Sequence, residues 1–281
     1  MNTSLAVFPA EEPHLHVSVS AVKLLQLCPR AYGYRYIVGA KDEQMPVRMV
    51  LGKAIHESLA QYYRALRDGR EAPSVDEMYS TALGVCEEQT LGDVPVVFES
   101  KESWASISAE ARQLLDIFVA KPFIPAKVLG VEEKFTLRLV DPVTGEEPFE
   151  EVVSGVFDLV CIDEQGRLTV VDHKVGKRKA NDEFDLQLAL YSWAAQQLYA
   201  ATEPPRLAWQ CLLRGKTPKV ELVELPRVEH DETEAVQSML SGVALIRATV
   251  AQEEPLRLLG RRRSWACAGC GYARRCAGER L

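Results

Sequence analysis

Residues 151–176 read EVVSGVFDLVCIDEQGRLTVVDHKVG. This segment predicts an antiparallel β-hairpin, because two runs rich in Val, Leu and Phe, Glu151–Ile162 and Leu168–Val175, flank a short polar turn. Gly166 supplies the left-handed backbone conformation that a three-residue hairpin loop needs. We therefore expect the two strands to be neighbours in a sheet, with a register that follows from the loop.

The loop length places two aspartates opposite each other. A three-residue loop pairs Asp163 with Arg167, and the same register then sets Asp158 opposite Asp172. Residues opposed in this way have Cβ atoms about 4.5–5.5 Å apart. Two carboxylates at that distance repel each other unless a proton or a divalent metal lies between them. A hard metal ion that prefers oxygen ligands is the natural partner for such a pair.

Asp158 also interrupts a strand that is apolar on both faces. Strict alternation puts Val153, Phe157 and Leu159 on one face, and Val156, Val160 and Ile162 on the other face together with Asp158. An ionised carboxylate that is buried there needs a cation or several hydrogen-bond donors nearby.

The second strand carries Asp172-His173-Lys174. The two-residue period of a strand projects Asp172 and Lys174 to one face and His173 to the other. Lys174 would reach an attacking water or a phosphate oxygen, so the group suits metal-assisted hydrolysis of a phosphodiester. The strand pattern alone leaves a second interpretation open, in which Asp158, Asp172 and Lys174 form an internal ion pair.

The remaining segments predict a mixed α/β domain. Helical patterns fall near residues 18–28, 47–68, 74–90, 102–121, 181–201 and 230–253, and further strands near 127–140, 206–213 and 219–225. Residues 1–17 are expected to be a flexible lead-in and residues 18–281 a single domain, with a helical insert at about 70–125. A cysteine-bearing tail at about 256–281 is expected to close onto Cys28.

Three helical side chains extend the pattern. On the helix at 47–68, His56 lies on a stripe with Gly52 and Ala60, whose small size would let the helix approach the sheet and bring His56 to the metal. A histidine that is simply packed in the core is the alternative. On the helix at 181–201, Gln187 and Tyr191 share a face and would either bind a substrate phosphate or base, or flank the apolar stripe.

The seven cysteines fall into two groups. Cys86, Cys161 and Cys211 occur singly and are expected to be small core residues. The other four lie near the two ends of the sequence and are candidate thiolate ligands: Cys28, Cys267, Cys270 and Cys276. Four thiolates hold either Zn²⁺ or a 4Fe–4S cluster, and the spacing alone leaves both open.

Composition and charge limit the classes of function. The 281 residues are 47% hydrophobic and 26% charged, which excludes fibrous and largely disordered proteins. No apolar run approaches the roughly 20 residues of a membrane helix, and the sequence starts without a signal-peptide pattern, so we expect a cytoplasmic protein.

The formal net charge is −7, yet residues 256–281 hold seven arginines and one glutamate. Such a basic tail suits a local contact with a polyanion, or is only a solvated tail.

Four short motifs occur in order along the chain: Gly52-Lys53-Ala54-Ile55-His56, Gly155-Val156-Phe157-Asp158, Val171-Asp172-His173-Lys174 and Gln187-x3-Tyr191. Together with Cys28-Pro29 and Cys267-x2-Cys270-x5-Cys276, they resemble the RecB-like branch of the PD-(D/E)XK nuclease superfamily. The resemblance covers about Ser18 to Cys276, and the aspartate in the D-x-K motif leans toward the RecB and AddB side.

The resemblance implies a restriction-endonuclease-like α/β core, with a mixed central sheet flanked by helices, that uses Mg²⁺ or Mn²⁺. The implied metal ligands are His56, Asp158, Asp172 and the backbone carbonyl of His173. The implied catalytic residues are Asp158, Asp172, Lys174, Gln187 and Tyr191. The resemblance also favours a 4Fe–4S cluster over Zn²⁺ at the cysteines, which are Cys28, Cys267, Cys270 and Cys276.

The implied activity is that of a DNA nuclease. We expect an exonuclease on single-stranded or frayed ends, in DNA repair, recombination or the processing of phage and mobile-element DNA, with a helicase or another recombination protein as a candidate partner. Contacts to the DNA backbone are expected from Lys177, Arg178, Lys179, Arg261, Arg262, Arg263, Arg274 and Arg275. Two alternatives stay open: end trimming for CRISPR adaptation, and a non-catalytic iron–sulfur DNA-binding subunit of a helicase–nuclease complex.

Overall fold

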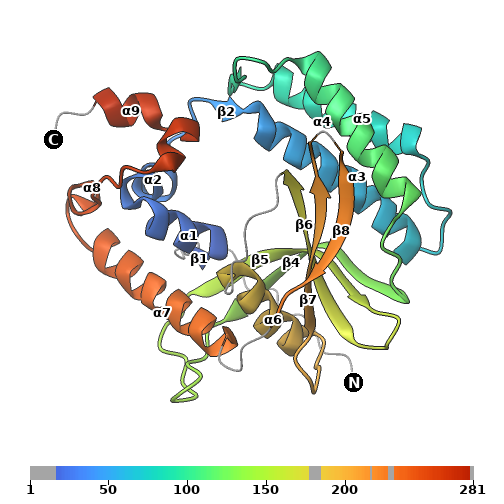
Figure 1. The fold of residues 1–281 in the computed structure, drawn as a ribbon. Helices are drawn as coiled ribbons and strands as arrows, with labels where there is room; N and C mark the ends of the chain where they lie inside the picture. The colour runs from blue at the N-terminus through green and yellow to red at the C-terminus, as the bar shows by residue number, and fades with distance from the viewer. Residues whose placement is uncertain (1–16, 177–184, 216, 227–230, 279–281) are drawn as a thin grey trace.

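The computed structural model describes residues 17–176, 185–215, 217–226 and 231–278 (Figure 1). The helices are α1 (Val19–Leu27), α2 (Pro29–Tyr32), η1 (Gly33–Ile37), α3 (Val47–Arg67), α4 (Val75–Leu91), α5 (Trp104–Ala120), α6 (Leu186–Leu198), α7 (Asp231–Val250), α8 (Pro255–Leu258), η2 (Trp265–Gly269) and α9 (Ala273–Gly278). The strands are β1 (Val17–Ser18), β2 (Met45–Pro46), β3 (Val96–Val97), β4 (Lys127–Arg138), β5 (Val152–Ile162), β6 (Leu168–Gly176), β7 (Arg206–Leu213) and β8 (Lys219–Glu224).

Local sequence signals set where several helices begin. Ser18 caps α1, since its hydroxyl accepts the backbone N–H of Ala21. Ser74 and Glu77 form a reciprocal capping box at the start of α4. The Asp185 carboxylate accepts two backbone N–H groups in the first turn of α6. These caps satisfy backbone donors that a helix start otherwise leaves without a partner.

The central sheet is six-stranded and mixed. Along one edge of β5 runs β4, antiparallel to it. The other edge of β5 is shared by β6, which is antiparallel, and by β1, which is parallel. Strand β6 then continues beside β7 in parallel, and β8 closes the order antiparallel to β7. Helices lie on both faces of this sheet, so the predicted α/β architecture with a mixed central sheet is confirmed.

The hairpin register is the predicted one. Leu159 pairs with Val171, and Ile162 pairs with Leu168. The turn residue Gly166 has φ 80°, which is the left-handed conformation that the three-residue loop requires. This register carries Asp158 and Asp172 to the next opposed positions.

The predicted alternation of faces along β5 is wrong at one point. Phe157 packs in the core layer formed with α1, α6 and α7, whereas Leu159 packs in the layer formed with α3, α4 and α5. The ladder pairs Val131 with Leu159 and then Glu133 with Phe157. Glu132, which lies between Val131 and Glu133, has a left-handed backbone with φ 46°. The strands change the face that they bury at this point, and Phe157 and Leu159 lie on opposite faces.

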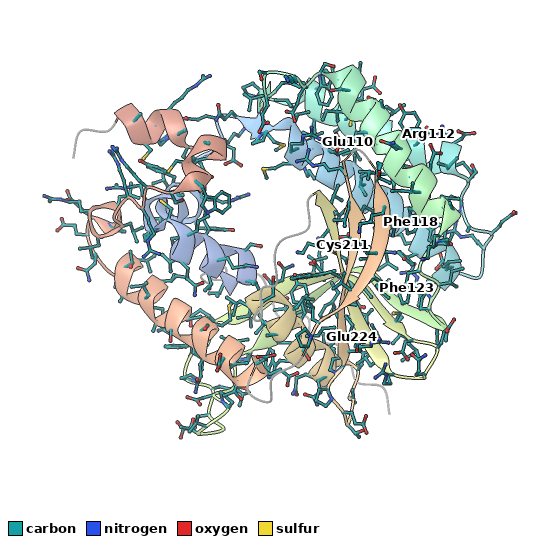
Figure 2. The ribbon with its side chains drawn as sticks, in the orientation of Figure 1. Glu110, Arg112, Phe118, Phe123, Cys211 and Glu224 are labelled. Atoms are coloured by element: carbon teal, nitrogen blue, oxygen red, sulfur yellow. The ribbon has the colours of Figure 1, made fainter. Side chains whose placement is uncertain are left out.

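The predicted helical insert consists of α4 and α5, which pack on α3. Phe118 of α5, labelled in Figure 2, is buried. Its ring packs edge to face against the ring of Tyr62 in α3, with ring centroids 5.0 Å apart. Ser58 of α3 donates its hydroxyl to the carbonyl of Met78 in α4 at 2.9 Å. The insert is therefore part of the core rather than a loose appendage.

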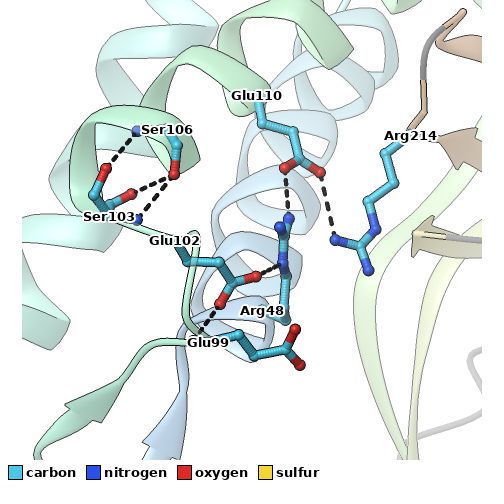
Figure 3. A network of polar contacts seen from close by, with 7 residues as sticks. All are labelled: Arg48, Glu99, Glu102, Ser103, Ser106, Glu110 and Arg214. Carbon is cyan, nitrogen blue, oxygen red and sulfur yellow. Dashed lines mark hydrogen bonds and ion pairs between the residues drawn. The ribbon is translucent and has the colours of Figure 1, made fainter.

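A polar network joins the insert to the end of the sheet (Figure 3). Arg48, at the start of α3, forms ion pairs with Glu102 and Glu110 of the insert. Glu110 Oε1 also lies 3.8 Å from Arg214 Nη1, just after β7. The backbone N–H of Arg214 donates to the carbonyl of Gly176 at 3.0 Å. Through this network the insert is connected to the end of β6, the strand that carries Asp172-His173-Lys174.

The C-terminal elements pack against the N-terminal helices (Figure 1). Gly33 of η1 packs against Leu256 and Leu259. A Cβ added at Gly33 would lie 2.6 Å from a methyl group of Leu256 and 2.7 Å from one of Leu259. The backbone N–H of Glu43 donates to the carbonyl of Gly271 at 2.8 Å. Two segments that are distant in the sequence thus form one small unit. Among the described helices, none is both long and apolar enough to cross a membrane.

Gly155 is expected to be intolerant of a side chain. It lies opposite Phe135 in the ladder, and an added Cβ would fall 2.4 Å from the Phe135 ring, which itself packs on Phe157. We expect Gly155→Ala to lower the free energy of unfolding in urea by about 1–3 kcal/mol, because the ring has to move out of a filled core. Gly84→Ala is the control, since no described atom lies within 4 Å of that Cβ position. Equal stability of Gly155→Ala and the parent protein would contradict this packing.

Candidate active site

The candidate site lies where β5 and β6 separate. The two strands pair as far as Leu159 and Val171, whereas β6 stays paired with β7 on its other edge as far as Gly176. At the next step the Asp158 carboxylate enters the gap, where its Oδ2 accepts the backbone N–H of His173 at 2.7 Å. A side chain thus takes the place of a ladder hydrogen bond. Asp158 and Asp172 are left on the two sides of the opening.

Two further side chains join Asp158. His56 Nδ1, on α3, lies 3.5 Å from Asp158 Oδ2. One ligand atom each from His56, Glu132 and Asp158 lie within 4.8 Å of one another, and this is the only such group of His, Cys, Asp or Glu among the described residues. Two carboxylates and an imidazole are a suitable ligand set for a divalent cation such as Mn²⁺ or Mg²⁺.

Glu132 was not among the residues predicted from the sequence. Its left-handed backbone brings its carboxylate to Asp158 and His56. Burial, followed by the nearby Asp158 charge, raises the pKa of Glu132 to about 7. A bound cation would remove the repulsion between the two carboxylates. The available sequence signal was a pair of glutamates, Glu132 and Glu133, inside an otherwise strand-like run.

Asp172 is buried on the opposite side of the gap and lies outside the group formed by His56, Glu132 and Asp158. Lys174 Nζ is 2.5 Å from Asp172 Oδ2, and Gln187 Nε2 donates to Asp172 Oδ1 at 3.1 Å. Burial raises the pKa of the Asp172 carboxyl above its usual range, although the Lys174 ammonium opposes this shift. Of the predicted metal ligands, the structure brings together His56 and Asp158, and it holds Asp172 against Lys174.

Helix α6 supports Asp172 through a short chain of contacts. Gln187 donates both to Asp172 and, at 3.3 Å, to the hydroxyl of Tyr191 one turn later. The Tyr191 ring is buried and packs edge to face against Phe135 and Phe157. The shared face of Gln187 and Tyr191 therefore points at the site, with the amide nearest to the carboxylate and the phenol behind it.

His173 projects to the other face of β6, as the strand period predicts. Its ring is buried and stacks on Tyr63 of α3, with ring centroids 5.6 Å apart. Burial lowers the pKa of His173 to about 4, so the imidazole is neutral at pH 7. The backbone of His173 faces the gap and fixes Asp158, while its side chain fixes the strand against α3.

The two small residues of the predicted α3 stripe, Gly52 and Ala60, differ in how closely they are packed. Ala60 is buried, whereas at Gly52 no described atom lies within 4 Å of the position that a Cβ would take. Gly52 is therefore not needed for close approach of α3 to the sheet. His56, between them, is partly exposed and faces Asp158 rather than a filled core.

The four terminal cysteines meet where the tail packs on α1 and α2. Cys28, Cys267 and Cys270 line one cavity of about 470 Å³. Cys276 and Cys270 pack with Cys28 around Tyr34 and Tyr272. Burial raises the pKa of the Cys270 thiol, and the charges of the three other cysteines raise it further. The remaining cysteines, Cys86, Cys161 and Cys211, are buried in the core.

The predicted basic residues are spread over the tail. Arg262 donates to the carbonyl of Gln26 at the end of α1, and Arg275 lies over the Tyr34 ring at 5.8 Å. Arg263 and Arg274 are exposed, and Arg261 is partly buried. Lys177, Arg178 and Lys179 lie outside the described residues.

Comparison with known proteins gives one family and a similar fold. The family model described as the PD-(D/E)XK nuclease superfamily matches residues 16–277. A crystal structure of a protein from Eubacterium rectale, named as a candidate exonuclease, has a TM-score of 0.57 at 13% identity, covering 95% of this chain and 89% of that one. The structure of a protein named SSO0001 covers 84% of this chain and 97% of that one, with 14% identity and a TM-score of only 0.35. Among curated proteins, none matches the chain.

Glu132 is expected to bind divalent metal. We expect Glu132→Gln to weaken Mn²⁺ binding by about 10–100-fold, because it removes one of two carboxylates from the group. Isothermal titration, or the rise in Tm that Mn²⁺ produces, measures the effect. Glu133→Gln is the matched control, since Glu133 instead bonds the hydroxyl of Tyr199. The assignment is wrong if the two variants bind Mn²⁺ equally well.

Proposed function

The chain belongs to the PD-(D/E)XK nuclease superfamily, and from this premise we propose that it is a metal-dependent deoxyribonuclease that degrades single-stranded or frayed DNA from an end. The observation that carries the proposal is the opening between β5 and β6. One side of it holds the cation-binding group of His56, Glu132 and Asp158, and the other side holds Asp172 paired with Lys174. A phosphodiester between the two sides would meet both a cation and a positioned ammonium group.

The metal and the protein would divide the chemistry. A divalent cation, Mg²⁺ or Mn²⁺, supplies Lewis acidity that lowers the pKa of water and neutralises charge on the phosphate. His56, Glu132 and Asp158 would hold it, with the carbonyl of His173 and a carboxylate oxygen of Asp172 as further donors. The His173 N–H already orients Asp158, which reduces the reorganisation that binding requires.

Lys174 would orient the attacking water or contact a phosphate oxygen. The Asp172 carboxylate raises the pKa of Lys174 against the lowering effect of burial, so the amine stays charged near pH 7. Gln187 holds Asp172 from the other side, and Tyr191 holds Gln187. This ordered chain keeps the ammonium at one position and so favours a catalytic role over a purely structural ion pair.

The DNA substrate and the end-directed mode rest on the resemblance to the RecB and AddB branch. Exposed arginines of the tail, among them Arg263 and Arg274, offer contacts to a DNA backbone that do not depend on base sequence. A separate helicase or another recombination protein would supply unwound strands. A non-catalytic DNA-binding subunit is the rival from a different class, and it has no need of the Asp172, Lys174 and Gln187 arrangement.

We also propose that Cys28, Cys267, Cys270 and Cys276 hold a 4Fe–4S cluster. Three of the four line one cavity, and the fourth packs beside them. The resemblance to the RecB and AddB branch favours the iron–sulfur cluster over Zn²⁺. Either group would fasten the tail to α1 and α2.

Cleavage of end-labelled single-stranded DNA with Mg²⁺ or Mn²⁺ tests the nuclease. We expect Asp172→Ala and Lys174→Ala to cut about 100-fold more slowly or worse, because each removes a charge positioned at the site. Lys134→Ala, which alters an exposed lysine of β4, should cut at the parent rate. An end-directed enzyme should leave circular single-stranded DNA intact. The proposal fails if Asp172→Ala degrades DNA as fast as the parent protein.

Metal analysis tests the cysteine site. Protein purified without oxygen should carry about four iron and four sulfide ions per chain. Cys270→Ala should lose the iron and melt at lower temperature, because the tail is then no longer fastened to α1 and α2. Cys86→Ala, which alters a buried cysteine outside the group, should keep the iron. One zinc ion per chain without iron would show that the site is a zinc site instead.

A further inference from the structure

A cavity of about 570 Å³ opens directly beside the cation-binding group. Its lining includes His56 and Glu132 of that group, and its other lining residues are Gly52, Lys53, Glu57, Val85, Glu88 and Gln89. It lies between α3, which carries His56, and α4 of the helical insert, two helices that run side by side (Figure 1). The insert therefore contributes one wall of a space that reaches the proposed point of cleavage.

Gly52 keeps this cavity open. Glycine in the interior of a helix is less favourable than alanine, so its presence there calls for a reason. Close packing is not the reason, because no described atom lies within 4 Å of the Cβ position of Gly52. Gly52 lies one helical turn before His56, on the same face of α3. A side chain at this position would project into the space next to His56.

The lining suits a base and a sugar rather than a second phosphate. Glu57 and Glu88 also border the cavity, and their carboxylates would repel a phosphate but accept hydrogen bonds from amino and hydroxyl groups. Gln89 can both donate and accept, as base edges do, and it already contacts Lys53 Nζ at 3.5 Å. Val85 provides an apolar wall. The volume of about 570 Å³ is that of a pocket for one small molecule.

We propose that this cavity binds the sugar and base of the nucleotide next to the cleaved phosphate, and that α4 thereby restricts cleavage to unpaired strands. The inference rests on the proposed nuclease function and gives the insert a role in it. The phosphate stays at the end formed by His56 and Glu132, while the unpaired nucleotide enters between α3 and α4.

Gly52→Leu tests the proposal, because the Cβ position of Gly52 is free of contacts within 4 Å and a larger side chain there would enter the cavity. The parent for this experiment is Lys174→Ala, so that binding is measured without depending on turnover. We expect Gly52→Leu to raise the Kd for a fluorescent single-stranded oligonucleotide at least tenfold, about 1.4 kcal/mol, with a Tm no lower than that of the parent. Binding of a blunt duplex should not change. Val85→Phe, which narrows the cavity from α4, should weaken single-strand binding in the same way.

Gly84→Leu is the matched control. Gly84 is also a glycine inside a helix with open space at its Cβ position, but it does not line the cavity. Its Kd for the single strand should equal that of the parent. The proposal is overturned if Gly52→Leu binds the single strand as tightly as the parent, or if Gly84→Leu loses as much affinity for the single strand as Gly52→Leu does. It is also overturned if Gly52→Leu loses as much affinity for the duplex as for the single strand. A parallel loss of Mn²⁺ affinity in Gly52→Leu would overturn it in favour of a cation subsite. Failure of the nuclease proposal would show separately, in the cleavage assay of the unaltered protein.

Discussion

The divergence of β5 from β6 is the feature on which the rest of the site depends. Strand β6 pairs with β5 only near the hairpin turn, and with β7 on its other edge along its whole length. Beyond Leu159 and Val171 the pairing with β5 ends, so the edge of β5 opens at Asp158. A carboxylate enters this opening and accepts the N–H of His173. The gap and the separation of its two aspartates follow from the end of that pairing.

The carboxylates on the two sides of the opening differ in how their charge is balanced. Asp172 is buried with Lys174 and Gln187 as partners, so its charge is compensated by the protein itself. Asp158 and Glu132 share one histidine and lie close to each other, which leaves net negative charge for a cation to neutralise. The two halves thus differ in their countercharge: Asp172 has the Lys174 ammonium beside it, whereas Asp158 and Glu132 have the His56 imidazole.

Long-range contacts hold these halves in place. The insert connects the start of α3 to the end of β6 through Arg48, Glu110 and Arg214. The tail returns to α1 and α2, where the four cysteines meet. Closing such a long loop costs only slightly more entropy than closing a short one, so a modest set of contacts is enough to keep the ends together.

The long helices and strands, the hairpin register and the places of Asp158, Asp172 and Lys174 along it could be predicted from the sequence, because a two-residue period and a three-residue loop marked by Gly166 are local properties. The two-residue strands β1, β2 and β3 could not be predicted, because each pairs with a distant part of the chain. That Glu132 joins His56 and Asp158 follows from the tertiary structure. Its backbone is left-handed, with φ 46°, and no strand period anticipates that conformation at a glutamate. Whether Gly52 faces the sheet or open space was equally beyond the sequence, because a helical stripe specifies a side of the helix but not what lies opposite it.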